Sequence, residues 1–129
     1  METLTDLQKK MASTLVDRMR ERVAQGAESP LIEEGDLARE IGQASWKRSN
    51  VDDLNVLLAF CDRKKYPPVS LLVVIPGLMK PEKSILIHAF KATLPAAEFN
   101  RRWKEQVEEI LTTPDEVWEA FKADVSIGE

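Results

Sequence analysis

Hydrophobic residues recur every three or four positions near the N-terminus, which predicts one long amphipathic helix over residues 4–25. Its apolar stripe consists of Leu4, Leu7, Met11, Leu15, Met19 and Val23. Thr5 and Gln8 match a capping box at the start of this helix, and Gly26 matches a stop. The stripe can pack on the body of the same chain, or it can form a homodimer through residues 4–23.

Two more helices are predicted before residue 64. The stretch GDLAREIG at 35–42 is a short helix, preceded by a connection at 27–33. The polar stretch QASWKRSN at 43–50 reads as a loop whose Ser49 or Asn50 caps a helix over residues 51–63. Its buried face consists of Val51, Leu54, Leu57, Leu58 and Cys61.

The stretch KKYPPVSLLVVIPG at 64–77 joins a basic pair to two prolines and an aliphatic run. Tyr66-Pro67-Pro68 cannot continue a helix, because proline lacks an N–H donor and restricts the residue before it. VSLLVVI at 69–75 therefore predicts a strand buried on both faces. SILIHAF at 84–90 predicts a second strand, which we expect to pair antiparallel with the first.

The last third predicts C-terminal helices over residues 96–123. Pro95 starts the first of them, and Thr113 as cap with Pro114 at the first position starts the second. Residues 124–129 are expected to fray. The pattern as a whole predicts one α+β domain over residues 1–129. Residues 1–26 form its long N-terminal helix, and its small helical, winged-helix-like body holds a short two- or three-stranded sheet.

The charge of the chain is unevenly distributed. Its formal net charge is −4, yet residues 1–104 hold 17 basic and 14 acidic residues, whereas residues 105–129 hold one lysine and eight acids. The acidic end predicts either a protein-binding surface or a solvated helix. Its candidate residues are Glu105, Glu108, Glu109, Glu116 and Glu119.

Several features predict a cytoplasmic protein. Cys61 is the single cysteine, so no internal disulfide can form, which fits a reducing compartment. The longest apolar runs, 56–61 and 71–75, fall far short of the roughly 20 residues that cross a bilayer. The start METLTDLQKK is amphipathic and does not match a secretory signal.

Histidine, cysteine and paired acidic residues are present, but their sequence surroundings do not favour a catalytic role. His88, the only histidine, falls in the apolar second strand, and Cys61 lies near a helix C-terminus, where the helix dipole opposes a thiolate. The acidic groups at 33–36 and at 52–53 fall at helix starts, where the dipole favours them. We therefore expect no enzyme, no catalytic residue, no cofactor and no metal site.

Basic residues flanked by aromatic ones form the candidate nucleic-acid surface. They occur in two groups on either side of the helix predicted at 51–63, and they would act together if the fold brings the groups together. The candidates are Trp46, Lys47, Arg48, Arg63, Lys64, Lys65 and Tyr66.

GDLAREIG, the helix after it and PPVSLLVV together resemble a poorly characterised bacterial domain of phages, mobile elements and defence genes. More distantly, the stretch from residue 34 to residue 75 resembles the winged-helix domain of alkylguanine-DNA alkyltransferases and alkyltransferase-like proteins. Where that family has Pro-Cys-His-Arg, this chain has Val69, Ser70, Leu71 and Leu72, so alkyl transfer to cysteine is not implied. The resemblance implies a binding scaffold.

Two function hypotheses follow. The first is a small non-enzymatic protein of bacterial or phage origin that acts by protein–protein interaction, as an inhibitor or accessory factor in phage–host defence such as a CRISPR nuclease inhibitor. The second is a winged-helix-like DNA-binding protein without alkyltransferase activity. Neither hypothesis involves a membrane.

Overall fold

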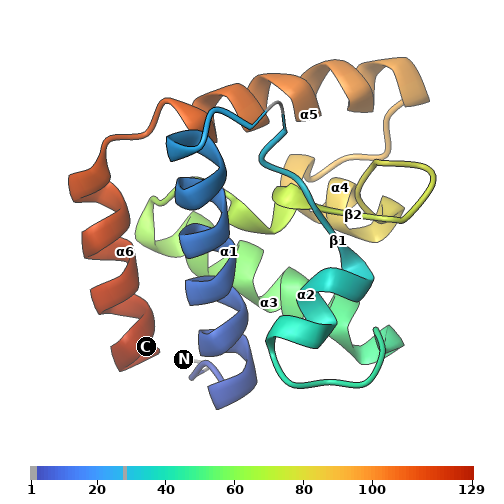
Figure 1. The fold of residues 1–129 in the computed structure, drawn as a ribbon. Coiled ribbons are helices and arrows are strands. Elements are labelled where there is room, and N and C mark those ends of the chain that lie inside the picture. The colour runs from blue at the N-terminus through green and yellow to red at the C-terminus, as the bar shows by residue number, and fades with distance from the viewer. Residues whose placement is uncertain (1–2, 28) are drawn as a thin grey trace.

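Helices surround a short buried segment in the computed structural model, which describes residues 3–27 and 29–129 (Figure 1). In this part of the chain the elements are, in order, α1 (Asp6–Ala24), β1 (Ile32–Glu33), α2 (Glu34–Glu40), α3 (Arg48–Lys64), the 3-10 helix η1 (Val69–Leu72), β2 (Val73–Val74), α4 (Lys83–Phe90), α5 (Ala96–Leu111) and α6 (Asp115–Ile127). Helices α1 and α6 lie side by side, and α5 runs across one end of both (Figure 1). The predicted α+β class, with a long N-terminal helix and C-terminal helices, is confirmed.

Helix α1 begins with the predicted capping box. The Thr5 N–H donates to Gln8 Oε1 at 3.0 Å, and the Gln8 N–H donates to Thr5 Oγ1 at 3.1 Å. Of the apolar stripe, Leu4, Met11, Leu15 and Met19 are buried in the core of their own chain, Leu7 is partly buried, and Val23 is half exposed. Packing on the body, the first of the two interpretations of this stripe, is therefore confirmed, and a homodimer stays a prediction.

Helix α3 begins earlier than its pattern predicts. It starts at Arg48, so the predicted loop is shorter. Asn50 lies inside the first turn, where its Oδ1 accepts hydrogen bonds from the Lys47 N–H at 2.8 Å and from Gln43 Nε2 at 2.8 Å. The side chain of Asn50 thus closes the start of the helix from within rather than from the cap position.

The segment Val69–Val74 is buried along its whole length, but only its last two residues form a strand. Because the prolines before it turn the chain, the Leu71 N–H donates to the Pro68 carbonyl at 3.1 Å and opens η1. Val73 and Val74 pair with Ile32 and Glu33 in parallel register. The prediction of a strand over 69–75 was therefore wrong in its first four residues, and the strand β1 was not predicted.

Residues 84–90 form helix α4, so the predicted second strand and antiparallel pair were wrong. The Ile85 and Leu86 N–H groups both donate to the Glu82 carbonyl, at 3.1 and 3.2 Å, which starts a helix. Ile85 and Leu86 are the buried residues of this helix. His88 lies exposed on this helix rather than inside a sheet.

The two C-terminal helices are present, but Thr113 does not cap the second one, and the second one is longer than predicted. Thr113 Oγ1 donates to the Glu109 carbonyl at 2.8 Å, so this hydroxyl bonds to the end of α5, and Pro114 is the residue before α6. Helix α6 continues to Ile127, with Val125 buried in the core. The Leu4 N–H donates to the Gly128 carbonyl at 2.8 Å. The expected fraying of residues 124–129 was therefore wrong.

Among the helices of the described residues, none combines the length and the apolar character that crossing a membrane requires.

We expect Trp103→Phe to lower the free energy of unfolding by about 1–3 kcal/mol, because it removes the donor to a buried carbonyl. The Trp103 indole N–H donates to the Leu71 carbonyl at 2.9 Å. Trp46→Phe is the matched control, since the Trp46 indole nitrogen is buried without a partner among the described residues. Denaturant unfolding measures both variants, and equal losses would contradict the hydrogen-bond argument.

Candidate functional site

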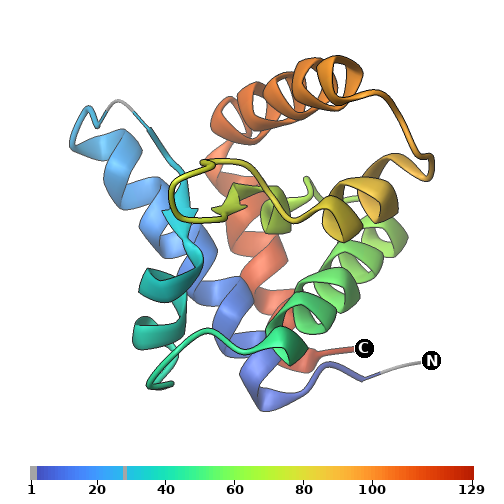
Figure 2. The same ribbon diagram turned by 90° about the vertical axis from the view of Figure 1, so that its right-hand side faces the viewer.

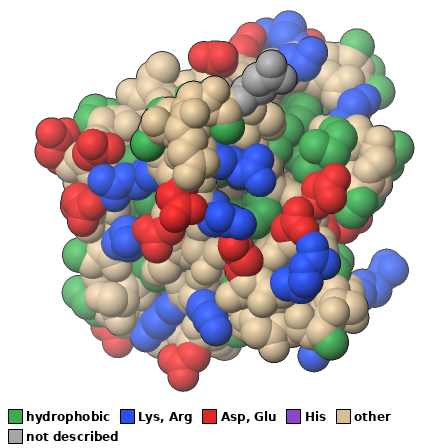
Figure 3. Space-filling view, in the orientation of Figure 1, with side chains coloured by type: hydrophobic (Ala, Val, Ile, Leu, Met, Phe, Trp, Pro, Cys, Tyr) green, Lys and Arg blue, Asp and Glu red, His purple; other side chains and the backbone are tan. Residues whose placement is uncertain are grey.

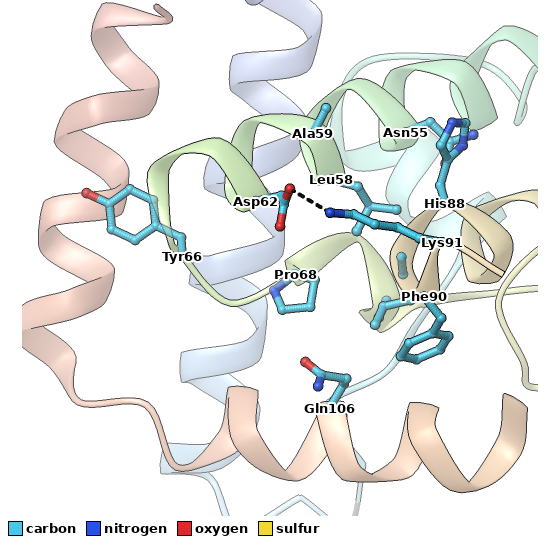
Figure 4. Close-up of a pocket in the computed structure, with 12 residues that line it drawn as sticks. Asn55, Leu58, Ala59, Asp62, Tyr66, Pro68, His88, Phe90, Lys91 and Gln106 are labelled. Atoms are coloured by element: carbon cyan, nitrogen blue, oxygen red, sulfur yellow. Dashed lines mark hydrogen bonds and ion pairs between the residues drawn. The ribbon is translucent and has the colours of Figure 1, made fainter. Parts of the chain in front are cut away.

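A cavity of about 400 Å³ opens between helices α3, α4 and α5 (Figure 4). We call it the groove. Helix α3 contributes one wall, the bend after α3 closes one end, and the C-terminal part of α4 forms the opposite wall. The lining residues are Asn55, Leu58, Ala59, Asp62, Tyr66, Pro68, Leu71, His88, Ala89, Phe90, Lys91 and Gln106. Its floor is apolar and its rim is polar, which is the usual composition of a binding site.

The ion pair of Asp62 and Lys91 spans the groove from α3 to the end of α4 (Figure 4). Lys91 Nζ lies 3.3 Å from Asp62 Oδ2, and both side chains are more than 60% exposed, at 72% and 65%. An exposed pair of this kind contributes little to stability, about 0–1 kcal/mol. The pair can therefore exchange partners with a bound molecule at small cost.

Asn55 of α3 and His88 of α4 both line the groove and are drawn toward the same end of it in Figure 4. Asn55 Oδ1 is buried and accepts no hydrogen bond from any described residue. A buried acceptor without a donor is costly, so a donor on a bound molecule or on a turned His88 ring would stabilise it. The sequence pattern assigned His88 to a strand, where it was considered and set aside, and no pattern in the sequence pointed to Asn55.

Tyr66 closes the other end of the groove and is tied to helix α6. Its hydroxyl donates to Asp124 Oδ2, and its ring meets the Phe121 ring edge-on with centroids 5.2 Å apart. The hydrogen bond to Asp124, with a smaller contribution from burial, raises the pKa of Tyr66 to about 12. Tyr66 therefore stays protonated and acts as a fixed wall.

The groove continues along α5 into a second hollow of about 330 Å³. The two share Phe90 and Gln106, and the second adds Arg101, Arg102 and Glu105. Arg101 Nη1 lies 2.7 Å from Glu105 Oε1, and Arg102 Nε lies 3.0 Å from Glu98 Oε1. These arginines lower the pKa of Glu98 through their hydrogen bonds to it. The combined hollow is elongated, with its charges balanced within the chain.

The candidate nucleic-acid residues do not converge. Trp46, Lys47 and Arg48 lie at the start of α3, whereas residues 63–66 lie at its end. Helix α3 is 17 residues long, so its two ends, and with them the two groups, lie about 24 Å apart along the axis. The Arg63 guanidinium lies over the Phe60 ring, 5.5 Å from its centroid. Each end of α3 therefore carries its own small basic group.

The acidic candidates divide into paired and unpaired residues. Glu105 pairs with Arg101, and Glu119 Oε1 lies 2.7 Å from Arg20 Nη1, a contact that lowers the pKa of Glu119. Glu108, Glu109 and Glu116 are exposed and make no ion pair with a described residue. Acidic and basic side chains alternate over the face of Figure 3, so that face has no field of one sign.

Cys61 is buried at 1% exposure, as the pattern of α3 predicts. Burial, as the largest cause, raises the pKa of the Cys61 thiol to about 12. The thiol points into the core and does not line the groove.

Glu34 is the buried acid that the sequence pattern did not reveal. It is the first residue of α2 and is 7% exposed, and its Oε2 has no hydrogen-bond partner among the described residues. Burial first, and then the neighbouring Glu82 carboxyl, raise the pKa of Glu34 from 4.5 to about 8. No cluster of three or more metal-ligating side chains occurs in the described residues, here or elsewhere. Glu34 and Glu82 are 48 residues apart in the sequence, so no local spacing predicts that they lie close together.

Comparison of the chain with protein-family models, curated proteins and solved structures found no match.

We expect Glu34→Gln to remove most of the pH dependence of stability between pH 6 and 9. The folded protein holds the Glu34 proton more tightly than the unfolded chain does, so its stabilisation is full below pH 4.5 and is lost as pH rises through about 8. The variant should exceed the native chain by about 1–3 kcal/mol in unfolding free energy at pH 9. Urea unfolding across this range measures the difference, with exposed Glu108→Gln as the control. Parallel pH curves for Glu34→Gln and the native chain would contradict it.

Proposed function

We propose that this protein is a non-enzymatic binding module that holds a short segment of a partner protein in the groove between α3, α4 and α5. The observation that carries the proposal is the apolar floor within a polar rim, at a volume of about 400 Å³. Such a hollow buries one or two apolar side chains of a partner and orients them by hydrogen bonds at the rim.

The elongated shape favours a peptide segment over a compact small molecule. The groove and the hollow beside α5 share Phe90 and Gln106, so a bound chain can pass from one into the other. An apolar residue of the partner would sit over Leu58 and Leu71, and the rest of the segment would follow α5. A bound segment of this kind uses one face of its chain, as amphipathic ligands of grooves do.

The acidic residues on α5 indicate the charge of the partner. Glu109 follows Gln106 by three positions and therefore lies on the same face of the helix. It is exposed and unpaired within the described chain, so it complements a basic residue that flanks the apolar anchor. A protein with a basic surface for nucleic acid meets this description, which is consistent with the proposed role of an inhibitor or accessory factor in phage–host defence.

We expect Ala59→Arg to abolish partner retention, because a long charged side chain from the rim would fill the groove. Ala59 is an exposed residue of α3, so the change leaves the core intact. Ala120→Arg is the matched control, since Ala120 is exposed on α6 and does not line the groove. Affinity capture from a nuclease-treated bacterial lysate compares the native chain with the two variants.

The proposal requires a protein that the native chain and Ala120→Arg retain and that Ala59→Arg loses at least tenfold. Equal retention of every captured protein by Ala59→Arg overturns the groove as the binding site. Recovery of nucleic acid alone, without a protein, favours the second candidate function. Thermal unfolding confirms beforehand that both variants are folded.

The second candidate function, DNA binding, is supported by the start of α3. Lys47 and Arg48 are exposed there, where the helix dipole adds positive potential for a phosphate. The seven candidate residues cannot form one DNA-binding surface, because residues 63–66 lie at the opposite end of α3 from Trp46, Lys47 and Arg48.

If the protein binds DNA in this way, Lys47→Ala with Arg48→Ala should weaken binding of a duplex about tenfold or more at low salt. The logarithm of the binding constant should also fall less steeply with the logarithm of the salt concentration, by the amount expected for the loss of about two phosphate contacts. Arg63→Ala with Lys64→Ala removes the same charge from the opposite end of α3 and serves as the control. Fluorescence anisotropy measures both, and equal losses would mean that binding follows net charge rather than a site.

A further inference from the structure

The connection from β2 to α4 forms a closed loop at the edge of the molecule (Figures 1 and 2). The Ile75 N–H donates to the Lys80 carbonyl at 2.9 Å, and the Met79 N–H donates to the Ile75 carbonyl at 2.9 Å. Between them the chain passes through Pro76, Gly77 and Leu78. We call residues 75–80 the tip loop.

The tip loop exposes two large apolar side chains. Leu78 is 67% exposed and Met79 is 42% exposed, although most large apolar residues of the described chain are buried. Single exposed apolar residues are common, but two adjacent ones at the end of a closed loop form a small continuous patch. Contact with water alone does not explain why apolar residues occupy positions 78 and 79.

Met79 also holds a strained backbone conformation. Its φ of 53° lies in the left-handed region, which costs a residue with a side chain about 1 kcal/mol or more. Gly77, at φ 84°, meets the same demand without strain. Lys65 and Lys91 share this conformation at the ends of α3 and α4, whereas Met79 adopts it in a loop, and strain of this kind gathers at functional sites.

The base of the tip loop is anchored on both sides. Val73 and Val74 before it are buried in the core, and Pro81 after it is buried as well. The loop is therefore presented in one shape and loses little conformational freedom when it binds.

Two lysines follow the apolar tip of the loop. Lys80 and Lys83 are exposed and form no ion pair with a described residue, while Glu82 is half-buried and lies against Glu34. An apolar tip followed by two lysines without an ion pair is complementary to an apolar pocket with an acidic rim.

We propose that the tip loop is a second interaction surface, which inserts Leu78 and Met79 into an apolar pocket, rimmed by Asp or Glu, on a partner protein. A lipid surface shares the required chemistry of apolar depth and negative charge. The tip offers only two side chains, however, whereas binding in a membrane interface uses a long apolar face. No tip-loop residue lines the groove, so the two surfaces are separate.

Photo-crosslinking tests this proposal independently of the groove. A photoreactive amino acid replaces Leu78 in one protein and Ala120 in a control, and both are irradiated in a nuclease-treated bacterial lysate. The proposal expects a protein that crosslinks at position 78 and not at 120. A lack of any product specific to position 78 overturns it, whatever Ala59→Arg shows.

The crosslinked protein, purified, then provides the quantitative measurement. Leu78→Ser with Met79→Ser should weaken its affinity at least tenfold, and Lys80→Glu with Lys83→Glu should weaken it as well and remove the loss of affinity with added salt. Unchanged affinity of the first double variant overturns the anchor, and tighter binding by the second overturns the acidic rim. The last experiment measures binding to anionic phosphatidylserine vesicles. Vesicle binding that depends on Leu78 and Met79 overturns the proposal of a protein partner in favour of a lipid surface.

Met79→Gly separates binding from folding. Because glycine adopts the left-handed conformation freely, this variant should unfold at an equal or higher temperature while it binds the partner more weakly. A variant that binds as tightly as the native chain overturns the role of the methionine side chain.

Discussion

The buried backbone of residues 69–74 is the constraint on which the other elements depend. A chain segment that enters the core with a 3-10 turn cannot satisfy all its polar groups within itself, so other elements must supply partners. Ser70 Oγ donates to the Leu54 carbonyl at 2.8 Å, and the indole of Trp103 donates to the carbonyl of Leu71. The first bond positions this segment on α3, and the second holds α5 over it. Parallel pairing of β2 with β1 completes the arrangement by drawing α2 to the same core.

The groove is a by-product of this arrangement. Leu71 is fully buried yet lies at the floor of the groove, so the same side chain belongs to the core and to the candidate site. Helix α5 is held by Trp103 on one side of η1, and α3 lies on the other, which leaves a space that α4 only partly fills. The walls are thus placed by core packing, whereas the rim residues are free to serve binding.

The sequence predicts the helices with local signals well and the central segment poorly. Thr5 and Gln8, or the apolar spacing of α5, describe interactions within a few residues, and these were correct. SILIHAF reads equally as strand or helix, because consecutive aliphatic residues suit a buried strand as well as a helix that packs on two neighbours. Whether this stretch becomes strand or helix depends on the Glu82 carbonyl, which accepts the first hydrogen bonds of α4, and on the packing of α4 against α3 and η1. The groove joins positions from Asn55 to Gln106, and Glu34 meets Glu82 across the chain, so neither has a signal in local spacing.

The hydrogen bond between Leu4 and Gly128 bears on how the chain folds. It joins the first helix to the end of the last, the longest separation along the chain among the backbone contacts described. Closing so long a loop costs conformational entropy, which the packing of α1 on α6 must offset. Because α1 precedes α6 along the chain, the face of α1 that packs on α6 has no such partner during synthesis until α6 has been made.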